Sequence, residues 1–440
     1  MSDIINKVHQ QILNGASVST DTRQIKENSV FFALKGENFD ANQFAEQALE
    51  KGALCAIVDD QNLPDHEQIL KVDNVLETLQ ELAHMHRNLF HIPVIGITGS
   101  NGKTTTKELV NAVLSTKYTT LCTEGNLNNH IGVPLTLLRL DSSHEIAIVE
   151  MGANHVGEIA FLTNLTRPGA GLITNIGKAH IEGFGSLENI VKGKTELYGF
   201  LQSTDGTIFV NKGNEILMSH LDEGKCITYG ASEHCQYSGR IESTDPFLQI
   251  SFRDPDQESD DRQWTQVKSN LLGTYNFENI MAAVAIGLHF GVEPARIKDA
   301  IENYSPRNNR SQLKHTQHNT LHMDAYNANP SSMHAALDNF FQLKTTSKKG
   351  LILGDMLELG EVSFDEHQKV VDRIRKDNYN LVILVGAEFN RISFDKPVHF
   401  HIFENTGQAS AWLKGHPVTG YTLLIKGSRG IQLEQLEDHL

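Results

Sequence analysis

The segment from Val94 to Thr106 constrains the fold of this chain more than any other stretch. It consists of an apolar strand-like run, a glycine-rich turn and a helical stretch that begins near Lys103. Gly99 and Gly102 allow backbone N–H groups to converge on phosphate oxygens, and the lysine can reach the outer phosphates. The Thr104 hydroxyl can bind Mg²⁺. The segment therefore predicts a nucleoside triphosphate site.

The glycine spacing of this segment differs from the strict Walker A pattern, because Ile97 stands where that pattern has glycine. A chance glycine-rich turn is the alternative interpretation, and the strand before it and the helix after it argue against chance. We expect the phosphates to contact Gly99, Ser100, Asn101, Gly102, Lys103, Thr104 and Thr105.

Apolar runs alternate with helical stretches through all 440 residues, which is typical of α/β proteins with buried parallel strands. We expect three domains: a small α/β unit at 1–90, a central parallel sheet at 91–312, and a doubly wound, Rossmann-like unit at 313–440. The strand-like runs that support this division are 30–34, 54–58, 93–98, 145–150, 171–175, 351–353, 381–385 and 422–425.

The charge of the chain restricts its partners. With 38 Lys and Arg against 54 Asp and Glu, the formal net charge is −16, which repels phosphate backbones and anionic lipid. No apolar run approaches the roughly 20 residues that span a bilayer, and residues 1–10 lack a signal-peptide core. The four cysteines match neither a zinc nor a disulfide pattern. We expect a cytoplasmic protein without membrane insertion or nucleic-acid binding.

Several further motifs, together with the phosphate loop, resemble the Mur ligase family, the ATP-dependent amide-forming enzymes of peptidoglycan precursor synthesis. The motifs are Ser19-Thr-Asp-Thr-Arg23, Phe31-Phe-Ala-Leu-Lys-Gly36, Asp324-Ala-Tyr-Asn-Ala-Asn-Pro330, Leu353-Gly-Asp-Met-Leu-Glu-Leu-Gly360 and Lys426-Gly-Ser-Arg-Gly430. The resemblance covers essentially the whole chain. It implies that the first domain binds a UDP-linked substrate, the second binds ATP, and the third is the ligase domain.

The motifs are most similar to the branch of the family that adds D-alanyl-D-alanine. This implies that the chain joins D-alanyl-D-alanine to UDP-N-acetylmuramoyl-tripeptide through an acyl phosphate, giving the pentapeptide precursor, ADP and phosphate. Alternatives are a single-amino-acid Mur ligase or a folylpolyglutamate synthase, and Tyr326-Asn-Ala-Asn-Pro330 argues against both. A P-loop switch protein would have no use for the lysine segment 191–196. A non-catalytic binding module is disfavoured because Lys103, Thr104, Glu150, His180 and Lys194 are all present. We expect a monomer.

A phosphoryl group that is being transferred carries a high negative charge, and metal ions and lysines stabilise that charge. Glu150 ends one strand-like run and His180 follows another, so both can bind a hard cation, although either can instead be a helix cap or a satisfied loop residue. The resemblance implies a lysine carbamylated by CO₂ at Lys194, with Lys192 as the competing choice. The expected catalytic residues are Lys103, Glu150, His180 and Lys194, and the expected ligands of two Mg²⁺ ions are Thr104, Glu150, His180 and Lys194.

The resemblance extends the nucleotide site beyond the phosphate loop. The stretch 272–279 resembles a family segment whose amides bind the adenine edge, with Tyr275 where histidine is common. Arg310 is implied to contact phosphate at the hinge into the third domain, and Arg307 is the competing choice. The residues implied in this part of the site are Asn276, Asn279, Arg310, Asp324 and Tyr326.

The muramoyl-peptide and the dipeptide are polar substrates, so we expect polar side chains to bind them. The stretch 123–134 is rich in amides and glycine, as a loop that binds a sugar-peptide would be, although an ordinary asparagine-rich turn is the alternative. The loop 426–429 has suitable chemistry for the dipeptide carboxylate. Separate sites on three domains imply a closure step. The expected substrate contacts are Thr22, Arg23, Asn126, Asn128, Asn129, Asn327 and Asn329.

Overall fold

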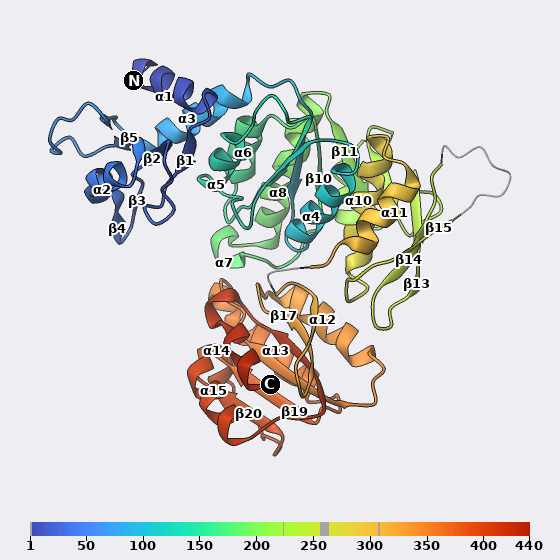
Figure 1. Cartoon of the computed structure of the whole chain (residues 1–440). Helices are drawn as coiled ribbons and strands as arrows, with labels where there is room; N and C mark the ends of the chain where they lie inside the picture. Colours follow the sequence, from blue (N-terminus) through green and yellow to red (C-terminus); the bar gives the residue numbers. More distant parts are fainter. Residues whose placement is uncertain (1, 223, 256–263, 307–308) are drawn as a thin grey trace.

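The computed structural model describes residues 2–222, 224–255, 264–306 and 309–440. The chain forms three α/β units, each built on its own sheet. In Figure 1 the N-terminal unit lies at the upper left of the central unit, and the C-terminal unit lies below it. The expected fold class, three α/β units with a central P-loop sheet and a doubly wound C-terminal unit, is confirmed.

The N-terminal domain has a four-stranded sheet in the order β1-β2-β5-β6, and each pair is parallel. Helix α3 begins where the side chain of Asn74 accepts a hydrogen bond from the Glu77 N–H, as an N-cap does. The elements are α1 Ser2–Leu13, β1 Ser17–Ser19, β2 Ser29–Phe32, β3 Lys35–Gly36, β4 Phe39–Asp40, α2 Ala45–Glu50, β5 Ala53–Val58, β6 Ile69–Lys71 and α3 Val75–Arg87.

The central domain has a nine-stranded sheet in the order β15-β14-β13-β12-β11-β10-β7-β9-β8. The strands from β8 to β13 are parallel, and β14 and β15 add an antiparallel edge. The strands are β7 Val94–Thr98, β8 Thr120–Cys122, β9 Ile146–Glu150, β10 Ala170–Ile173, β11 Thr207–Asn211, β12 Ile227–Gly230, β13 Tyr237–Ser243, β14 Gln249–Phe252 and β15 Thr265–Lys268. The helices are α4 Lys103–Leu114, α5 Gly132–Leu137, α6 Glu158–Thr166, α7 Ile181–Phe184, α8 Leu187–Ser203, α9 Glu215–Met218, α10 Asn276–His289 and α11 Pro294–Asn303.

The C-terminal domain has a six-stranded sheet in the order β16-β17-β21-β18-β19-β20, in which only the β16 edge is antiparallel. The carboxyl ends of its parallel strands form one edge, where ligands bind in open α/β sheets. The elements are β16 Gln312–His315, β17 Thr320–Asp324, α12 Pro330–Gln342, β18 Lys348–Gly354, α13 Ser363–Ile374, β19 Leu381–Val385, α14 Ala387–Asn390, β20 Phe400–Phe403, α15 Thr406–Gly415 and β21 Tyr421–Lys426.

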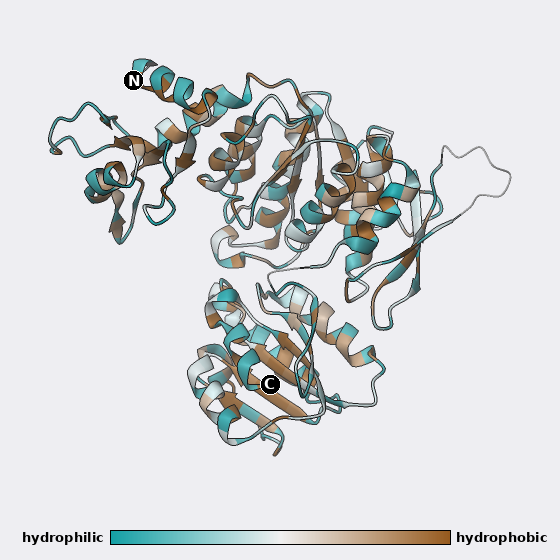
Figure 2. Ribbon diagram, viewed as in Figure 1, coloured by the Kyte–Doolittle hydropathy of each residue, from teal (hydrophilic) through white to brown (hydrophobic). Residues whose placement is uncertain are grey.

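The strands are buried because helices cover both faces of the two larger sheets. Figure 2 shows hydrophobic residues on the strands and polar residues on outward helix faces. One apolar cluster continues from the N-terminal domain into the central domain, where Leu79 and Leu82 of α3 join Val133 and Leu137 of α5. Helix α3 therefore ties these two domains together.

Buried polar groups of α3 add to this connection. His86 Nε2 lies 2.8 Å from the Leu140 carbonyl oxygen, and His86 Nδ1 lies 3.0 Å from His9 Nε2 of α1. Arg87 Nε donates to the carbonyl of Thr166 at the end of α6, at 2.8 Å. These bonds connect α3 to the segment after α5 and the end of α6 in the central domain, and to α1 in the N-terminal domain.

The histidine pair predicts a pH-dependent stability. Burial lowers the pKa of both His9 and His86 below the ordinary value of 6.5. The unfolded chain therefore binds protons first, and the free energy of unfolding should fall as pH drops below about 6.5. We expect His9→Gln to flatten the slope between pH 6.5 and 5.5 by about 1 kcal/mol per pH unit in urea titrations. The exposed control His66→Gln should keep the wild-type slope, and equal slopes in all three proteins would contradict this account.

Candidate active site

The turn between β7 and α4 requires glycine at two positions. Gly99 and Gly102 have φ angles of 142° and 78°, in the left-handed region that favours glycine. A Cβ atom on Gly99 would lie 2.0 Å from Thr174 Oγ1, and one on Gly102 would lie 2.6 Å from Asn279 Oδ1. The turn places backbone N–H groups at the start of α4, where a helix attracts an anion.

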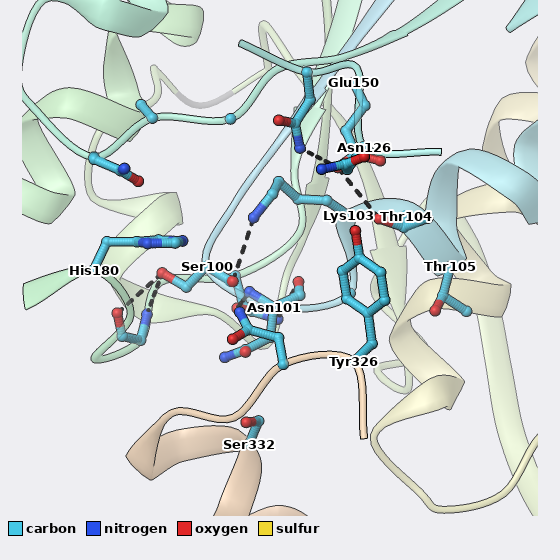
Figure 3. Close-up of a pocket in the computed structure, with 18 of the residues that line it drawn as sticks. Ser100, Asn101, Lys103, Thr104, Thr105, Asn126, Glu150, His180, Tyr326 and Ser332 are labelled. Atoms are coloured by element: carbon cyan, nitrogen blue, oxygen red, sulfur yellow. Dashed lines mark hydrogen bonds between the residues drawn. The ribbon is translucent and has the colours of Figure 1, made fainter. Parts of the chain in front are cut away.

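A cavity of about 950 Å³ opens beside this turn, between the central and the C-terminal domains. Figure 3 shows Lys103, Glu150 and Tyr326 entering it from different segments. The predicted site residues that line it are Ser100, Asn101, Gly102, Lys103, Thr104, Thr105, Asn126, Asn128, Asn129, Glu150, His180, Asn276, Asn279, Arg310, Asp324, Tyr326 and Asn327.

Glu150 offers a buried acceptor to a cation. Its Oε1 accepts hydrogen bonds from Asn128 Nδ2 at 2.7 Å and from Thr104 Oγ1 at 3.3 Å. Its Oε2 is buried without a hydrogen-bond partner among the described residues. A buried carboxylate oxygen without a partner costs free energy unless a ligand satisfies it.

Lys103 folds back over the glycine turn. Its Nζ donates to the carbonyl oxygen of Gly99 at 2.7 Å, and burial lowers its pKa. The side chain therefore lies over the position where the phosphates of a nucleotide would contact the turn. A phosphate group would restore the charged form of the amine, because an anion nearby favours the ammonium.

Lys194 of α8 lies behind the cavity wall. Its side chain is fully buried, and its Nζ donates to the carbonyl oxygen of Ala153, which lines the cavity, at 3.0 Å. Burial, followed by the charge of Lys103, holds the pKa of the Lys194 amine well below its usual range. Lys192 is exposed on the same helix. Lys194 does not itself line the cavity, but of this pair it is the one that is buried against a residue of the cavity wall.

His180 contacts a residue that the sequence analysis did not single out. Its Nδ1 bonds to a carboxylate oxygen of Glu358, across the boundary between the central and C-terminal domains. Both residues have left-handed backbones, with φ angles of 55° and 61°. The bond to the imidazole lowers the pKa of the Glu358 carboxyl. Strain at paired residues of a cavity wall is typical of functional sites.

Further bonds hold the C-terminal domain against the phosphate loop. Asn329 Nδ2 donates to Asn101 Oδ1 at 2.7 Å, and Lys178 Nζ lies 3.0 Å from Glu366 Oε1. The Ser331 hydroxyl accepts from the Lys178 N–H at 3.2 Å. Asn329 does not itself line the cavity, and it also caps helix α12. The C-terminal domain therefore contacts this side of the central domain through the start of α12 and through α13.

The comparisons with known proteins cover nearly the whole chain. Three family models match: "Mur ligase family, catalytic domain" at 16–87, "Mur ligase middle domain" at 97–287, and "Mur ligase, glutamate ligase domain" at 309–429. A protein of Bacillus subtilis (strain 168) named UDP-N-acetylmuramoyl-tripeptide--D-alanyl-D-alanine ligase is 35% identical, over 97% of this chain and 93% of its own length. The chain belongs to the Mur ligase family.

Other members of the Mur ligase family resemble the chain in sequence and structure. The Escherichia coli (strain K12) protein with the same ligase name is 34% identical over 99% of this chain and 96% of its own length. The structure of MurF from Acinetobacter baumannii matches with a TM-score of 0.84 at 29% identity, over 98% of this chain and 97% of that chain. The structural similarity to MurF therefore includes all three domains of this Mur ligase.

The side-chain amides of Asn276 and Asn279, at the start of α10, form hydrogen bonds within the protein in this Mur ligase. Asn279 Oδ1 accepts from the Thr106 hydroxyl at 3.0 Å, and its Nδ2 donates to Asn276 Oδ1 at 2.8 Å. Both residues line the cavity, and the bond from Thr106 to Asn279 links α4 to α10. Their contact with adenine stays a prediction.

Two arginines lie close to the ring of one tyrosine that lines the cavity. The guanidinium carbon of Arg310 lies 3.6 Å from the ring centre of Tyr326, and that of Arg429 lies 5.3 Å from it. Asp324 forms an ion pair with Lys426 at 2.6 Å. The competing choice Arg307 lies outside the described residues.

The predicted uridine contacts lie away from this cavity. Thr22 and Arg23 are in the N-terminal domain and do not line it, and the Arg23 guanidinium lies 2.8 Å from Asp21 with its side chain 87% exposed. Their role stays a prediction.

Within the described ranges, no three His, Cys, Asp or Glu side chains form a ready-made metal centre. No described helix is both long and apolar enough to cross a bilayer.

Proposed function

We propose that this Mur ligase joins D-alanyl-D-alanine to UDP-N-acetylmuramoyl-tripeptide at the expense of ATP, giving the pentapeptide precursor, ADP and phosphate. The observation that carries this proposal is the cavity that joins the glycine turn of the central domain to the Tyr326-Asn-Ala-Asn loop of the C-terminal domain. Relatives that cover nearly the whole chain bear the dipeptide-adding name, which favours this reaction over addition of a single amino acid.

The phosphate loop is proposed to hold ATP. Backbone N–H groups of residues 99–105 would surround the phosphates, and Lys103 would neutralise the outermost one. The γ-phosphoryl would pass to the tripeptide carboxylate, forming one P–O bond to the acyl oxygen while the bond to the ADP oxygen breaks. The resulting acyl phosphate is the species that an amine can attack.

Magnesium fits this site on the evidence of Glu150. Its unpartnered buried Oε2, together with the Thr104 hydroxyl, is an all-oxygen donor set of the kind that Mg²⁺ prefers. When bound, the cation would neutralise charge that develops on the phosphates. His180 is proposed to complete the metal surroundings with its second ring nitrogen, because Nδ1 is held by Glu358.

Lys194 is proposed to carry a carbamate. Burial lowers the pKa of this amine and so favours its neutral form, whose electron pair can bond to the carbon of CO₂ with release of one proton. The product is a carbamate anion, directed at the wall that contains Ala153. Such an anion can hold a second Mg²⁺.

The substrates are proposed to occupy opposite walls. Asn126 and Asn129 line the cavity beside Glu150 and would hold the muramoyl-peptide, while Asn327 faces it from the C-terminal domain. Contacts such as Asn101 with Asn329 would exclude water from the acyl phosphate when the domains close. We further propose that the enzyme acts as a cytoplasmic monomer.

Product analysis tests the proposed function. The enzyme should convert UDP-N-acetylmuramoyl-tripeptide, ATP and D-alanyl-D-alanine into a product whose mass increases by one dipeptide residue. Free D-alanine, L-lysine and glutamate should give no product under the same conditions. A product that contains a single amino acid, or turnover of a folate with glutamate, would contradict the proposal.

A further inference from the structure

The proposed reaction requires a cation for the free carboxylate of the incoming dipeptide. D-Alanyl-D-alanine is a zwitterion at neutral pH, and its carboxylate lies about 7 Å from its amine when it is extended. A carboxylate that enters a closed cavity needs a charged partner or several N–H donors. A guanidinium meets this need well, because its planar fork forms two parallel hydrogen bonds.

Two of the cavity cations already have partners. Within the part of the chain that the structure describes, the lysines and arginines that line the cavity are Lys103, Arg310, Lys426 and Arg429. Lys103 lies over the phosphate loop with its Nζ on the carbonyl oxygen of Gly99. Lys426 is neutralised, because its Nζ lies 2.6 Å from Asp324 Oδ2 and its side chain is only 1% exposed.

The two remaining cations meet at one ring. Arg310 packs 3.6 Å from the ring centre of Tyr326, and Arg429 Nη1 donates to the hydroxyl of the same tyrosine at 3.4 Å. No carboxylate of the described residues forms an ion pair with either guanidinium. Two like charges at one aromatic ring repel each other, so this arrangement favours a site for two anions. In the proposed reaction, the nucleotide would supply one anion and the dipeptide carboxylate the other.

Arg429 rests on a well-anchored loop. The Ser428 N–H donates to the Asp355 carbonyl at 3.1 Å, and the Ser428 hydroxyl accepts from the Leu357 N–H at 2.9 Å. A Cβ atom on Gly430 would lie 2.9 Å from the Leu357 side chain, so the two loops pack closely. The exposed arginine therefore projects from a fixed base at the carboxyl end of β21.

We propose that Arg429 binds the carboxylate of the incoming dipeptide and that Arg310 stays with the nucleotide phosphates. This assignment rests on the function proposed above, and it makes Arg429 the residue that distinguishes a free carboxylate from a blocked one. Asn327 and the backbone near Lys426 then lie on the dipeptide side of the cavity.

The test compares D-alanyl-D-alanine with D-alanyl-D-alaninamide, whose carboxylate is replaced by a neutral amide. We expect the wild-type enzyme to prefer the free carboxylate by about 100-fold in kcat/KM, as hydrogen bonds to a charged group predict. In Arg429→Ala, kcat/KM for D-alanyl-D-alanine should fall by about the same factor, chiefly through KM. The value for the amide should change less than about threefold, so the preference disappears.

Control variants separate this role from a structural one. Arg391→Ala removes an exposed arginine of the same domain and should keep the wild-type preference. Arg429→Lys keeps the charge without the fork and should restore part of the preference. If Arg429→Ala keeps the full preference, or slows both dipeptides equally, the assignment is wrong while the proposed function stands. If the wild-type enzyme uses neither dipeptide, the proposed function is wrong and the assignment is wrong with it.

Discussion

Replacing Lys194 by alanine should lower kcat for amide formation by about 10³-fold or more while ATP still binds with nearly wild-type affinity. The expectation follows from position, because this fully buried amine lies behind the cavity wall and not beside the phosphate loop. Its loss removes an anion that would act on the transferred phosphoryl group, and preorganised charges of this kind contribute about 10²–10³-fold each. Steady-state kinetics and calorimetric ATP titration measure the two quantities.

Lys192→Ala is the matched control for this prediction. Lys192 lies two residues away on the same helix, carries the same charge and is exposed. Its removal should leave kcat within about twofold, as exposed substitutions usually do. Wild-type enzyme prepared without CO₂ should also lose activity and regain it on addition of bicarbonate. Near-normal turnover of Lys194→Ala would remove the carbamate from the mechanism.

Replacing Lys103 by alanine should lower kcat/KM for ATP by about 10³-fold, and both kcat and ATP affinity should contribute. The Nζ lies over the carbonyl of Gly99, where it would meet the outer phosphates, and cations at a transferring phosphoryl group contribute about 10³-fold or more. The replacement also removes an amine whose charged form is disfavoured by burial, as its lowered pKa indicates, so the apo protein should not be less stable.

Lys117→Ala is the control for the phosphate-loop lysine. Lys117 follows the same helix, is exposed and donates only to backbone carbonyls of Phe290 and Gly291. Its removal should leave kcat/KM for ATP within about threefold. Equal losses in both variants would indicate a general effect of charge on the protein and would contradict a specific role of Lys103.

The parts of the site that depend on local sequence could be predicted. A strand followed by a glycine turn and a helix is set by neighbouring residues, and Glu150 is placed by the end of its own strand. The orientation of Lys194 is also a local property. It shares the helical spacing of Ile190, Leu197 and Leu201, which places it on the buried face, while Lys192 falls on the opposite one.

The contacts between domains could not be predicted, because no local pattern determines which loops meet. Glu358 lies in the quoted Leu353–Gly360 motif, but its bond to His180 depends on how two sheets are placed. The same holds for Lys178 with Glu366 and for the histidine pair of α1 and α3. The left-handed backbone of Glu358 also marks it as unusual, but this property is visible only in the structure, because it depends on the φ angle.

The most direct test of the acyl-phosphate route follows oxygen atoms. The tripeptide substrate is labelled with ¹⁸O in the carboxylate that forms the amide, and the enzyme is supplied with ATP, Mg²⁺ and D-alanyl-D-alanine. We predict that each phosphate released carries one ¹⁸O atom, because the carboxylate oxygen that attacks phosphorus leaves with it when the amine attacks carbon. Amide formation with unlabelled phosphate, or phosphate release without either acceptor, would contradict the account.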